Sequence, residues 1–169
     1  MFKWFGVVNL SPSTRVAEFA QLLREGHLMA SRCSACGDRS FPPRADCARC
    51  LSADFEFLEL KGHGTLYTFT EVSVAPAGFE TYAPYTLGVV DLEEGGRAMA
   101  WIGESLAAED LEIGMSLQLV PRLRDDVEEI QVFYTLETPG YARDRAGATV
   151  TSLLAVWPRE PATEGERIR

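Results

Sequence analysis

The sequence contains no run of apolar residues long enough to span a membrane, which takes about 18 or more. Histidine occurs only 2 times in 169 residues, and no Gly-x-Gly-x-x-Gly, phosphate-loop or Gly-x-Ser-x-Gly pattern is present. These absences argue against a membrane-spanning protein and against the common nucleotide-binding and serine-hydrolase sites. The apolar start, residues 1–10, is too short for a secretory signal, and no small-residue cleavage site follows it. We therefore expect a cytoplasmic protein.

Cysteine is also scarce, and its four residues are confined to one short stretch. They form two Cys-x-x-Cys pairs, Cys33 with Cys36 and Cys47 with Cys50. Two such pairs can place four thiolates around one tetrahedral Zn²⁺. The residues between the pairs are rich in turn formers and too few for a helical hairpin, which favours a zinc ribbon. Two disulfides or four unrelated thiols are the alternatives, and a reducing cytoplasm disfavours the disulfides.

The cysteine pattern also bears on catalysis. A catalytic zinc keeps one coordination position open to water, whereas four thiolates close the coordination sphere. We therefore expect one structural zinc per chain, held by the four cysteines. Since this site uses every thiol, no cysteine is left as a nucleophile, and His27 and His63 are the only imidazoles. The sequence predicts no catalytic residue and no independent enzymatic activity.

The chain is long enough for one ordinary domain, or for a small metal module joined to a modest core. Hydrophobic residues make up 46% of it, which is enough to bury such a core. Ser11 and Pro12 are typical of a helix start, and apolar residues continue at helical spacing up to Gly26. We predict one amphipathic helix here, with its apolar stripe in the core.

After the cysteines the apolar periodicity changes to two, and β-branched and aromatic residues become frequent. Residues 61–64 form a glycine-flanked bend before the first strand, and residues 93–96 predict a hairpin turn. Five strands without a β-α-β rhythm predict a small closed barrel of the OB type, with an SH3-like barrel or a sandwich as alternatives. The five segments are residues 65–74, 85–92, 97–102, 114–123 and 129–136.

These signals predict a mainly β protein with a small α part and divide it into four segments. Residues 1–27 form an apolar arm and a helix, and residues 28–53 form a rubredoxin-like zinc ribbon. Residues 54–138 form the five-stranded OB-fold barrel. Residues 139–169 form a C-terminal tail around one apolar patch, expected to be partly mobile or to dock on a partner. The arm packs either on a partner or on its own domain.

Positive charge is scarce in the barrel segment. The net charge of the chain is −9, and residues 61–145, with 6 basic and 15 acidic residues, account for all of it. OB folds often bind single-stranded nucleic acid through a basic groove with stacking aromatics, and this is the alternative function. Because polyanions are bound by neutralising their phosphates, an acidic barrel repels them. We therefore expect a protein partner, with no nucleic acid and no membrane.

An ordered set of short motifs adds a family resemblance. The motifs are Glu25-Gly26-His27-Leu28, Cys33-Ser34-Ala35-Cys36-Gly37, Phe41-Pro42-Pro43-Arg44, Cys47-Ala48-Arg49-Cys50, Gly64-Thr65-Leu66-Tyr67-Thr68-Phe69-Thr70, Pro84-Tyr85 and Gly88-Val89-Val90-Asp91-Leu92-Glu93-Glu94-Gly95. Over about residues 15–136 the chain resembles the zinc-ribbon/OB-fold proteins that accompany thiolases and thiolase-like enzymes. These proteins were long known only as a domain of unknown function.

The resemblance implies a non-catalytic subunit of a complex that makes or breaks C–C bonds in acyl-CoA thioesters. Such subunits accompany thiolases, hydroxymethylglutaryl-CoA synthases, acyltransferases or thiolase-like aldolases, where they bridge catalytic subunits or help enclose the CoA thioester. The resemblance also implies that the partner is a thiolase-like catalytic subunit and that a CoA thioester binds only in a site shared with that partner. His63 departs from the family pattern, which more often has arginine between the two glycines. A scaffold unrelated to CoA is a further alternative.

Two groups of residues are candidates for contact with the partner or its CoA. The ribbon is mildly basic, so its arginines can assist an anionic ligand, although a solvated surface explains them equally well. The segment 74–84 is long for a hairpin connection and is stiffened by prolines, as binding loops often are. A loop folded over the barrel end is the alternative. The candidates are Arg39, Arg44 and Arg49 in the ribbon and Gly78, Phe79 and Tyr82 in the loop.

Overall fold

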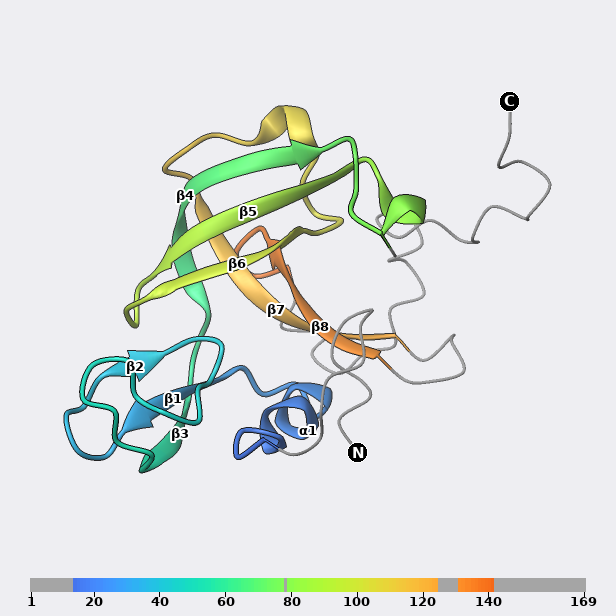
Figure 1. Cartoon of the computed structure of the whole chain (residues 1–169). Helices are drawn as coiled ribbons and strands as arrows, with labels where there is room; N and C mark the ends of the chain where they lie inside the picture. The colour runs from blue at the N-terminus through green and yellow to red at the C-terminus, as the bar shows by residue number, and fades with distance from the viewer. Residues whose placement is uncertain (1–13, 78, 125–130, 142–169) are drawn as a thin grey trace.

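The computed structural model describes residues 14–77, 79–124 and 131–141, and it shows a small three-stranded sheet and one helix beside a closed barrel (Figure 1). The apolar arm before residue 14 and most of the C-terminal tail lie outside the described residues, so the predictions for them stay predictions. No helix within the described ranges is long and apolar enough to cross a membrane. In chain order the elements are α1 (Glu18–Arg24), β1 (Met29–Cys33), β2 (Arg39–Ser40), β3 (Phe55–Glu59), β4 (His63–Val72), η1 (Glu80–Tyr82), β5 (Tyr85–Leu92), β6 (Arg97–Ile102), η2 (Ala108–Asp110), β7 (Ser116–Arg124) and β8 (Gln131–Glu137).

The helix α1 is shorter than the sequence predicts. Regular helix begins at Glu18, because the residues before it form tighter turns in which the N–H of Ala17 bonds the carbonyl of Thr14. Its last residue is Arg24, and Gly26 follows as the predicted stop, with a positive φ of 91° that glycine adopts at little cost. Phe19 and Leu23 are 4% and 1% exposed, so the apolar stripe faces the core.

The metal-binding segment is a three-stranded antiparallel sheet in the order β2-β1-β3. β3 pairs with β1 along its whole length, from Met29 opposite Glu59 to Cys33 opposite Phe55. β3 follows the second cysteine pair, and it lies beside β1, which ends at Cys33 of the first pair. This pairing fixes the two cysteine pairs relative to each other.

The barrel is closed in the strand order β4-β5-β6-β8-β7, and each of its five strands overlaps one of the five segments that the sequence predicts. β4 pairs with β5 and, at its start, with β7, and a bulge between Leu66 and Thr68 bends it between these neighbours. A short parallel contact of β6 with β8, at Trp101 opposite Thr135, closes the circle. The mainly β class, the zinc ribbon and the OB-type barrel are thus confirmed.

A continuous apolar core joins the helix, the ribbon and the barrel. Phe19 and Leu23 of α1 belong to the same buried cluster as Leu28 and the inward side chains of the barrel. The ring of Phe41 lies 6.2 Å from that of Phe19 and 5.2 Å from that of Tyr134 in β8. Because these contacts cross all three parts, the ribbon is attached to the barrel by packing as well as by the chain.

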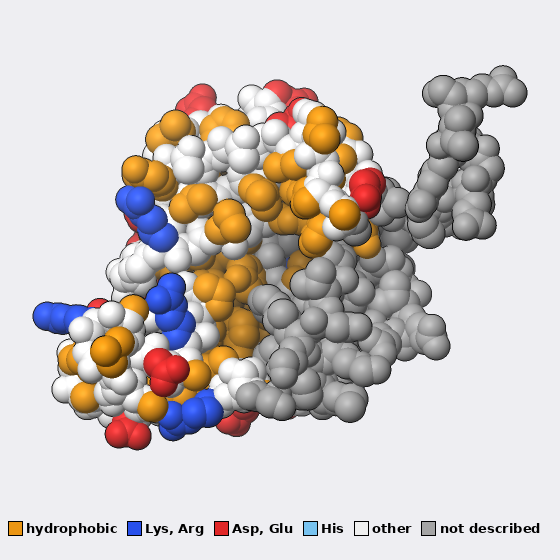
Figure 2. Space-filling model, in the orientation of Figure 1, with side chains coloured by type: hydrophobic (Ala, Val, Ile, Leu, Met, Phe, Trp, Pro, Cys, Tyr) orange, Lys and Arg blue, Asp and Glu red, His pale blue; other side chains and the backbone are white. Residues whose placement is uncertain are grey.

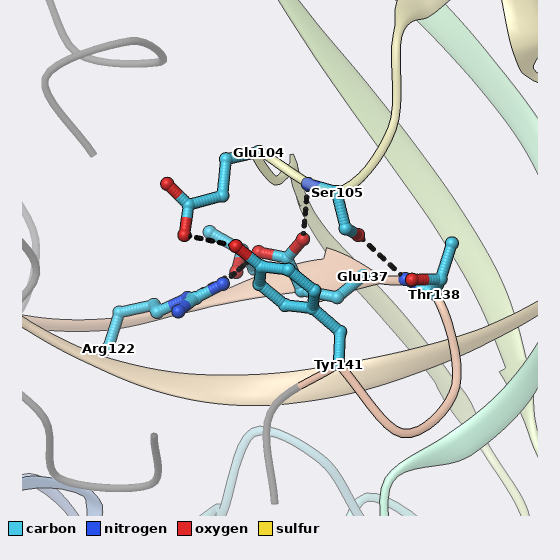
Figure 3. A network of polar contacts seen from close by, with 7 residues as sticks. Glu104, Ser105, Arg122, Glu137, Thr138 and Tyr141 are labelled. Atoms are coloured by element: carbon cyan, nitrogen blue, oxygen red, sulfur yellow. Dashed lines mark hydrogen bonds and ion pairs between the residues drawn. The ribbon is translucent and has the colours of Figure 1, made fainter. Parts of the chain in front are cut away.

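One ion pair is buried in this otherwise apolar setting. The side chains of Arg122 in β7 and Glu137 in β8 are 1% and 0% exposed, and the guanidinium donates to the carboxylate (Figure 3). The Arg122 Nε also donates to the Thr135 hydroxyl at 3.0 Å, and the backbone N–H of Ser105 donates to Glu137 at 3.0 Å. These hydrogen bonds satisfy charges that would otherwise be costly to bury.

The network around this pair continues to the barrel end. The Tyr141 ring lies 5.6 Å from the Arg122 guanidinium carbon, and its hydroxyl donates to Glu104 at 2.6 Å (Figure 3). Gly103 lies against Glu137 so closely that an added Cβ would overlap the carboxylate. The network therefore links β7 and β8 to the segment that follows β6.

Candidate metal centre and partner-facing residues

The two Cys-x-x-Cys pairs form two knuckles with the same backbone hydrogen bonds. In the first, the N–H of Gly37 donates to the carbonyl of Cys33 at 2.9 Å, and the N–H of Cys33 donates to Asp38 at 2.8 Å. In the second, Leu51 donates to Cys47 and Cys47 donates to Ser52, both at 2.9 Å. The equal spacing of the two motifs thus produces two equivalent turns, each presenting two sulfur atoms.

The four sulfur atoms meet in one place, with all Sγ atoms within 4.8 Å of one another. The Sγ atoms of Cys33 and Cys50 are 3.5 Å apart, and those of Cys36 and Cys47 are 3.6 Å apart. Zn–S bonds of about 2.3 Å in a regular tetrahedron place the sulfurs about 3.8 Å apart, so the cluster fits a Zn²⁺ ion. All four thiols are free, which leaves the two-disulfide alternative without support.

The thiols differ in how readily they ionise. Hydrogen bonding from the Cys36 backbone N–H is the main cause that lowers the pKa of Cys33 to about 7. At Cys36 the backbone N–H of Asp38 lowers the pKa, but the neighbouring thiols and burial outweigh it and raise the value to about 12. Four thiolates so close together repel one another, so complete ionisation requires a cation among them.

The two knuckles differ at one position, and the difference affects backbone strain. Gly37 in the first has φ of 76°, and Leu51 at the same place in the second has φ of 61°. Leu51 is the one residue other than glycine with positive φ in the described part of the chain, and its side chain is 83% exposed. The turn geometry imposes this conformation, because it brings the Leu51 N–H onto the Cys47 carbonyl.

The three candidate arginines of the ribbon differ in their contacts. The guanidinium of Arg39 donates to the backbone carbonyl of Glu94 at 3.0 Å, in the turn between β5 and β6. Its side chain therefore joins the ribbon to the barrel. Arg44 and Arg49 have exposed side chains, and their backbone N–H groups donate to the Ser31 hydroxyl and to the Cys47 Sγ, respectively.

The loop between β4 and β5 lies across one end of the barrel. The ring of Phe79 lies 6.1 Å from that of Tyr82, and the Tyr82 ring lies 5.8 Å from that of Trp101 in β6. Trp101 in turn stacks on Tyr85 at 4.7 Å. Gly78, the third loop candidate, lies outside the described residues.

A groove of about 340 Å³ lies beside this aromatic row. Tyr85 and Trp101 line it, together with the acidic residues Glu71 and Glu104. Tyr85 and Trp101 lie in predicted strands, but the groove itself was not predicted, because only the folded barrel brings Glu71 and Glu104 to one site. The alternation of buried and outward residues along β5 and β6 was the available signal for the aromatic part of the groove. It places Leu87 and Trp101 on the outward face, where the strand register sets them opposite each other.

The histidines lie apart from the metal cluster's ligands. His27 Nδ1 lies 2.8 Å from Glu59 Oε1, and both side chains are largely exposed. This hydrogen bond is the main cause that raises the pKa of His27. His63 is the first residue of β4, opposite Gln118 of β7.

Comparison with known proteins identifies both parts of the chain. Residues 20–56 match the ChsH2 rubredoxin-like zinc ribbon domain, and residues 58–122 match the ChsH2 C-terminal OB-fold domain. A DUF35 domain-containing scaffold protein of Methanocaldococcus jannaschii is 38% identical over 109 residues, which cover 63% of this chain and 77% of the relative.

Two further matches are named as a thiolase subunit and as an aldolase. The benzoylsuccinyl-CoA thiolase subunit BbsA of Thauera aromatica is 36% identical over 77 residues, covering 46% of this chain and 52% of BbsA. A solved structure of the Ltp2-ChsH2(DUF35) aldolase matches with a TM-score of 0.60 and 26% identity, covering 76% of this chain and 98% of the matched chain. The chain therefore belongs to the family of zinc-ribbon and OB-fold proteins that includes ChsH2 and the DUF35 domain-containing scaffold proteins.

Proposed function

We propose that this protein is a non-catalytic, zinc-binding subunit of a thiolase-type enzyme complex that acts on acyl-CoA thioesters. It stabilises the catalytic subunit and helps to shape the CoA and acyl site. The likeness to a thiolase subunit and to an aldolase complex supports this proposal, as do relatives named as scaffold proteins.

The observation that carries the proposal is the use of every thiol in one cluster. A thiolase needs a nucleophilic cysteine activated by a base. Here all four Sγ atoms lie within 4.8 Å of one another, in an arrangement that a single zinc would close. His27 bonds Glu59 on the surface instead of activating a thiol. The chemistry therefore belongs to a partner.

The zinc has a structural role in this proposal. Cys33, Cys36, Cys47 and Cys50 would hold it, and when bound it would supply the cross-link that a small ribbon needs in place of a large core. The ribbon's own residues then present Arg44 and Arg49 at an exposed surface.

CoA binding in the complex depends mainly on the partner. CoA is anionic, and residues 61–145 carry 6 basic and 15 acidic residues, so the barrel is a poor site for its phosphates. Arg44 and Arg49 are the ribbon cations available to assist, whereas Arg39 already bonds the barrel. Phe79 and Tyr82 of the loop remain candidates for contact near the acyl site.

Co-expression with the thiolase-like catalytic subunit of the same organism, followed by gel filtration, tests the proposal. We expect the two chains to co-elute and the thiolysis rate of the catalytic subunit to rise in the complex. A catalytic subunit that elutes alone, with the same thiolysis rate with and without this chain, would contradict it. A salt-sensitive shift of a single-stranded oligonucleotide by this chain would instead favour the nucleic-acid alternative.

A further inference from the structure

The outer face of β4, β5 and β6 carries an exposed apolar patch. Every second residue of β5 and β6 is buried: 88, 90 and 92 in β5, and 98, 100 and 102 in β6. The residues between them therefore point outward. On this outer side Val89 lies opposite Met99, and Leu87 lies opposite Trp101. Met99 is 60% exposed and Tyr67 of β4 is 49% exposed. We call the residues Tyr67, Leu87, Val89, Met99 and Trp101 the β4–β6 patch.

Arg97, a cation beside the patch, is already paired. Arg97 lies opposite Asp91 and forms an ion pair with its carboxylate, and its guanidinium carbon lies 3.6 Å from the centre of the Tyr67 ring. The opposite charges of Arg97 and Asp91 therefore cancel beside the patch. Figure 2 shows hydrophobic side chains over this part of the barrel, with carboxylates towards its margins.

The groove described above continues the patch at one end. Trp101 belongs to both, and beyond it lie Tyr85 and the carboxylates of Glu71 and Glu104. Glu104 is held in place by the Tyr141 hydroxyl at 2.6 Å. An aromatic surface beside two carboxylates suits a cationic side chain, and a planar guanidinium in particular can stack on a ring while it bonds a carboxylate.

The patch has the composition of an interface centre. Tyrosine, tryptophan and methionine, which the patch contains, are enriched at the centres of protein interfaces, whereas lysine, glutamate and aspartate, which it lacks, are depleted there. The same face is a common ligand-binding face of OB folds, but here the charge of Arg97 is neutralised by Asp91, which disfavours nucleic acid. An uncharged centre with an acidic edge complements a protein surface with an apolar centre and a cationic edge.

We propose that the catalytic partner docks on the β4–β6 patch and inserts an arginine side chain into the groove between Trp101 and the carboxylates of Glu71 and Glu104. Apolar contact with Met99 and Val89 supplies the buried centre of the interface. The carboxylates orient the partner and select against surfaces that lack the cation. This inference rests on the proposed function, because it names the surface through which that function operates.

The test uses the full chain and the co-expressed catalytic subunit, with affinity measured by titration calorimetry. Met99→Glu places a charge in the centre of the patch, and Glu71→Lys places a cation in the groove. Each is expected to weaken binding by about tenfold or more. Ile113→Glu and Glu112→Lys are matched controls, since Ile113 is 71% exposed and both residues lie outside the patch and the groove lining. Thermal unfolding and zinc content show whether each variant stays folded.

The outcomes separate this inference from the proposed function. Loss of affinity in the two test variants but not in the controls supports the docking surface. Wild-type affinity in all four variants overturns it and leaves the proposed function standing. A wild-type chain that does not bind the catalytic subunit overturns both. A homodimer that Met99→Glu converts to a monomer assigns the patch to a second copy of this chain and also overturns the inference.

Discussion

Leu51 and Gly37 hold the same place in two equivalent turns, so they offer a comparison within one molecule. Both have positive φ, 61° and 76° respectively. A residue with a Cβ loses about 1–2 kcal/mol in this conformation, whereas glycine adopts it freely. The second knuckle therefore contains strain that the first does not.

We predict that Leu51→Gly stabilises the protein by about 0.5–1 kcal/mol, less than the full strain because glycine also gains freedom in the unfolded chain. Urea unfolding of the zinc-loaded protein measures the change. Leu51→Ala is the control, since alanine keeps the Cβ and should leave the stability nearly unchanged. A glycine variant less stable than the alanine variant would show that the turn is not strained.

The sequence predicted the metal cluster well at this scale, because the Cys-x-x-Cys spacing alone specifies a knuckle. It predicted the surroundings less well. Arg39, a candidate for contact with the partner or its CoA, also donates from its guanidinium to the carbonyl of Glu94, which lies 55 residues further along the chain. Only the packing of the ribbon against the barrel makes that contact, and no local pattern encodes it.

At the scale of elements, alternation made the barrel predictable. β6 shows strict alternation, with Ala98, Ala100 and Ile102 buried and the residues between them more exposed. The helix start was less predictable, because Ser11 and Pro12 are good cap residues whether or not a regular helix follows directly. Pairing of β3 with β1 was also not visible, since periodicity shows a strand but not its neighbour.

The ribbon is the element most dependent on a ligand. We predict that Cys47→Ser releases the zinc and unfolds the ribbon while the barrel strands stay protected, because the ribbon has little core of its own. Metal analysis and hydrogen exchange measure the two effects. Ser34→Ala, an exposed change between the first two cysteines, should keep one zinc per chain. A Cys47→Ser protein that also keeps one zinc would contradict the assignment of the ligands.

At the scale of the whole molecule, ribbon and barrel meet at the turn between β5 and β6. The Glu94 Oε1 accepts from the Lys61 backbone N–H at 2.7 Å, and the Glu94 carbonyl accepts from Arg39. One residue thus bonds the ribbon and the chain that enters the barrel. This junction fixes the direction in which the ribbon extends from the barrel.

We predict that Glu94→Ala loosens this junction at a cost of about 1 kcal/mol, since it removes the acceptor of one backbone hydrogen bond. Faster hydrogen exchange at Lys61, with unchanged exchange in β7 and β8, would confirm it. Glu93→Ala is the matched control, because that neighbouring side chain is exposed. Equal exchange at Lys61 in both variants would show that packing alone sets the junction.

The buried pair of Arg122 and Glu137 has a consequence for how the family can diverge. Loss of either partner alone leaves an uncompensated buried charge, at a cost of about 3–5 kcal/mol, and a larger residue at 103 would displace the carboxylate. Replacing both charges together with apolar groups is far less costly. Substitutions at these three positions should therefore occur together among relatives of this chain. Relatives that share all three residues then share this barrel core more reliably than relatives that share only one of them.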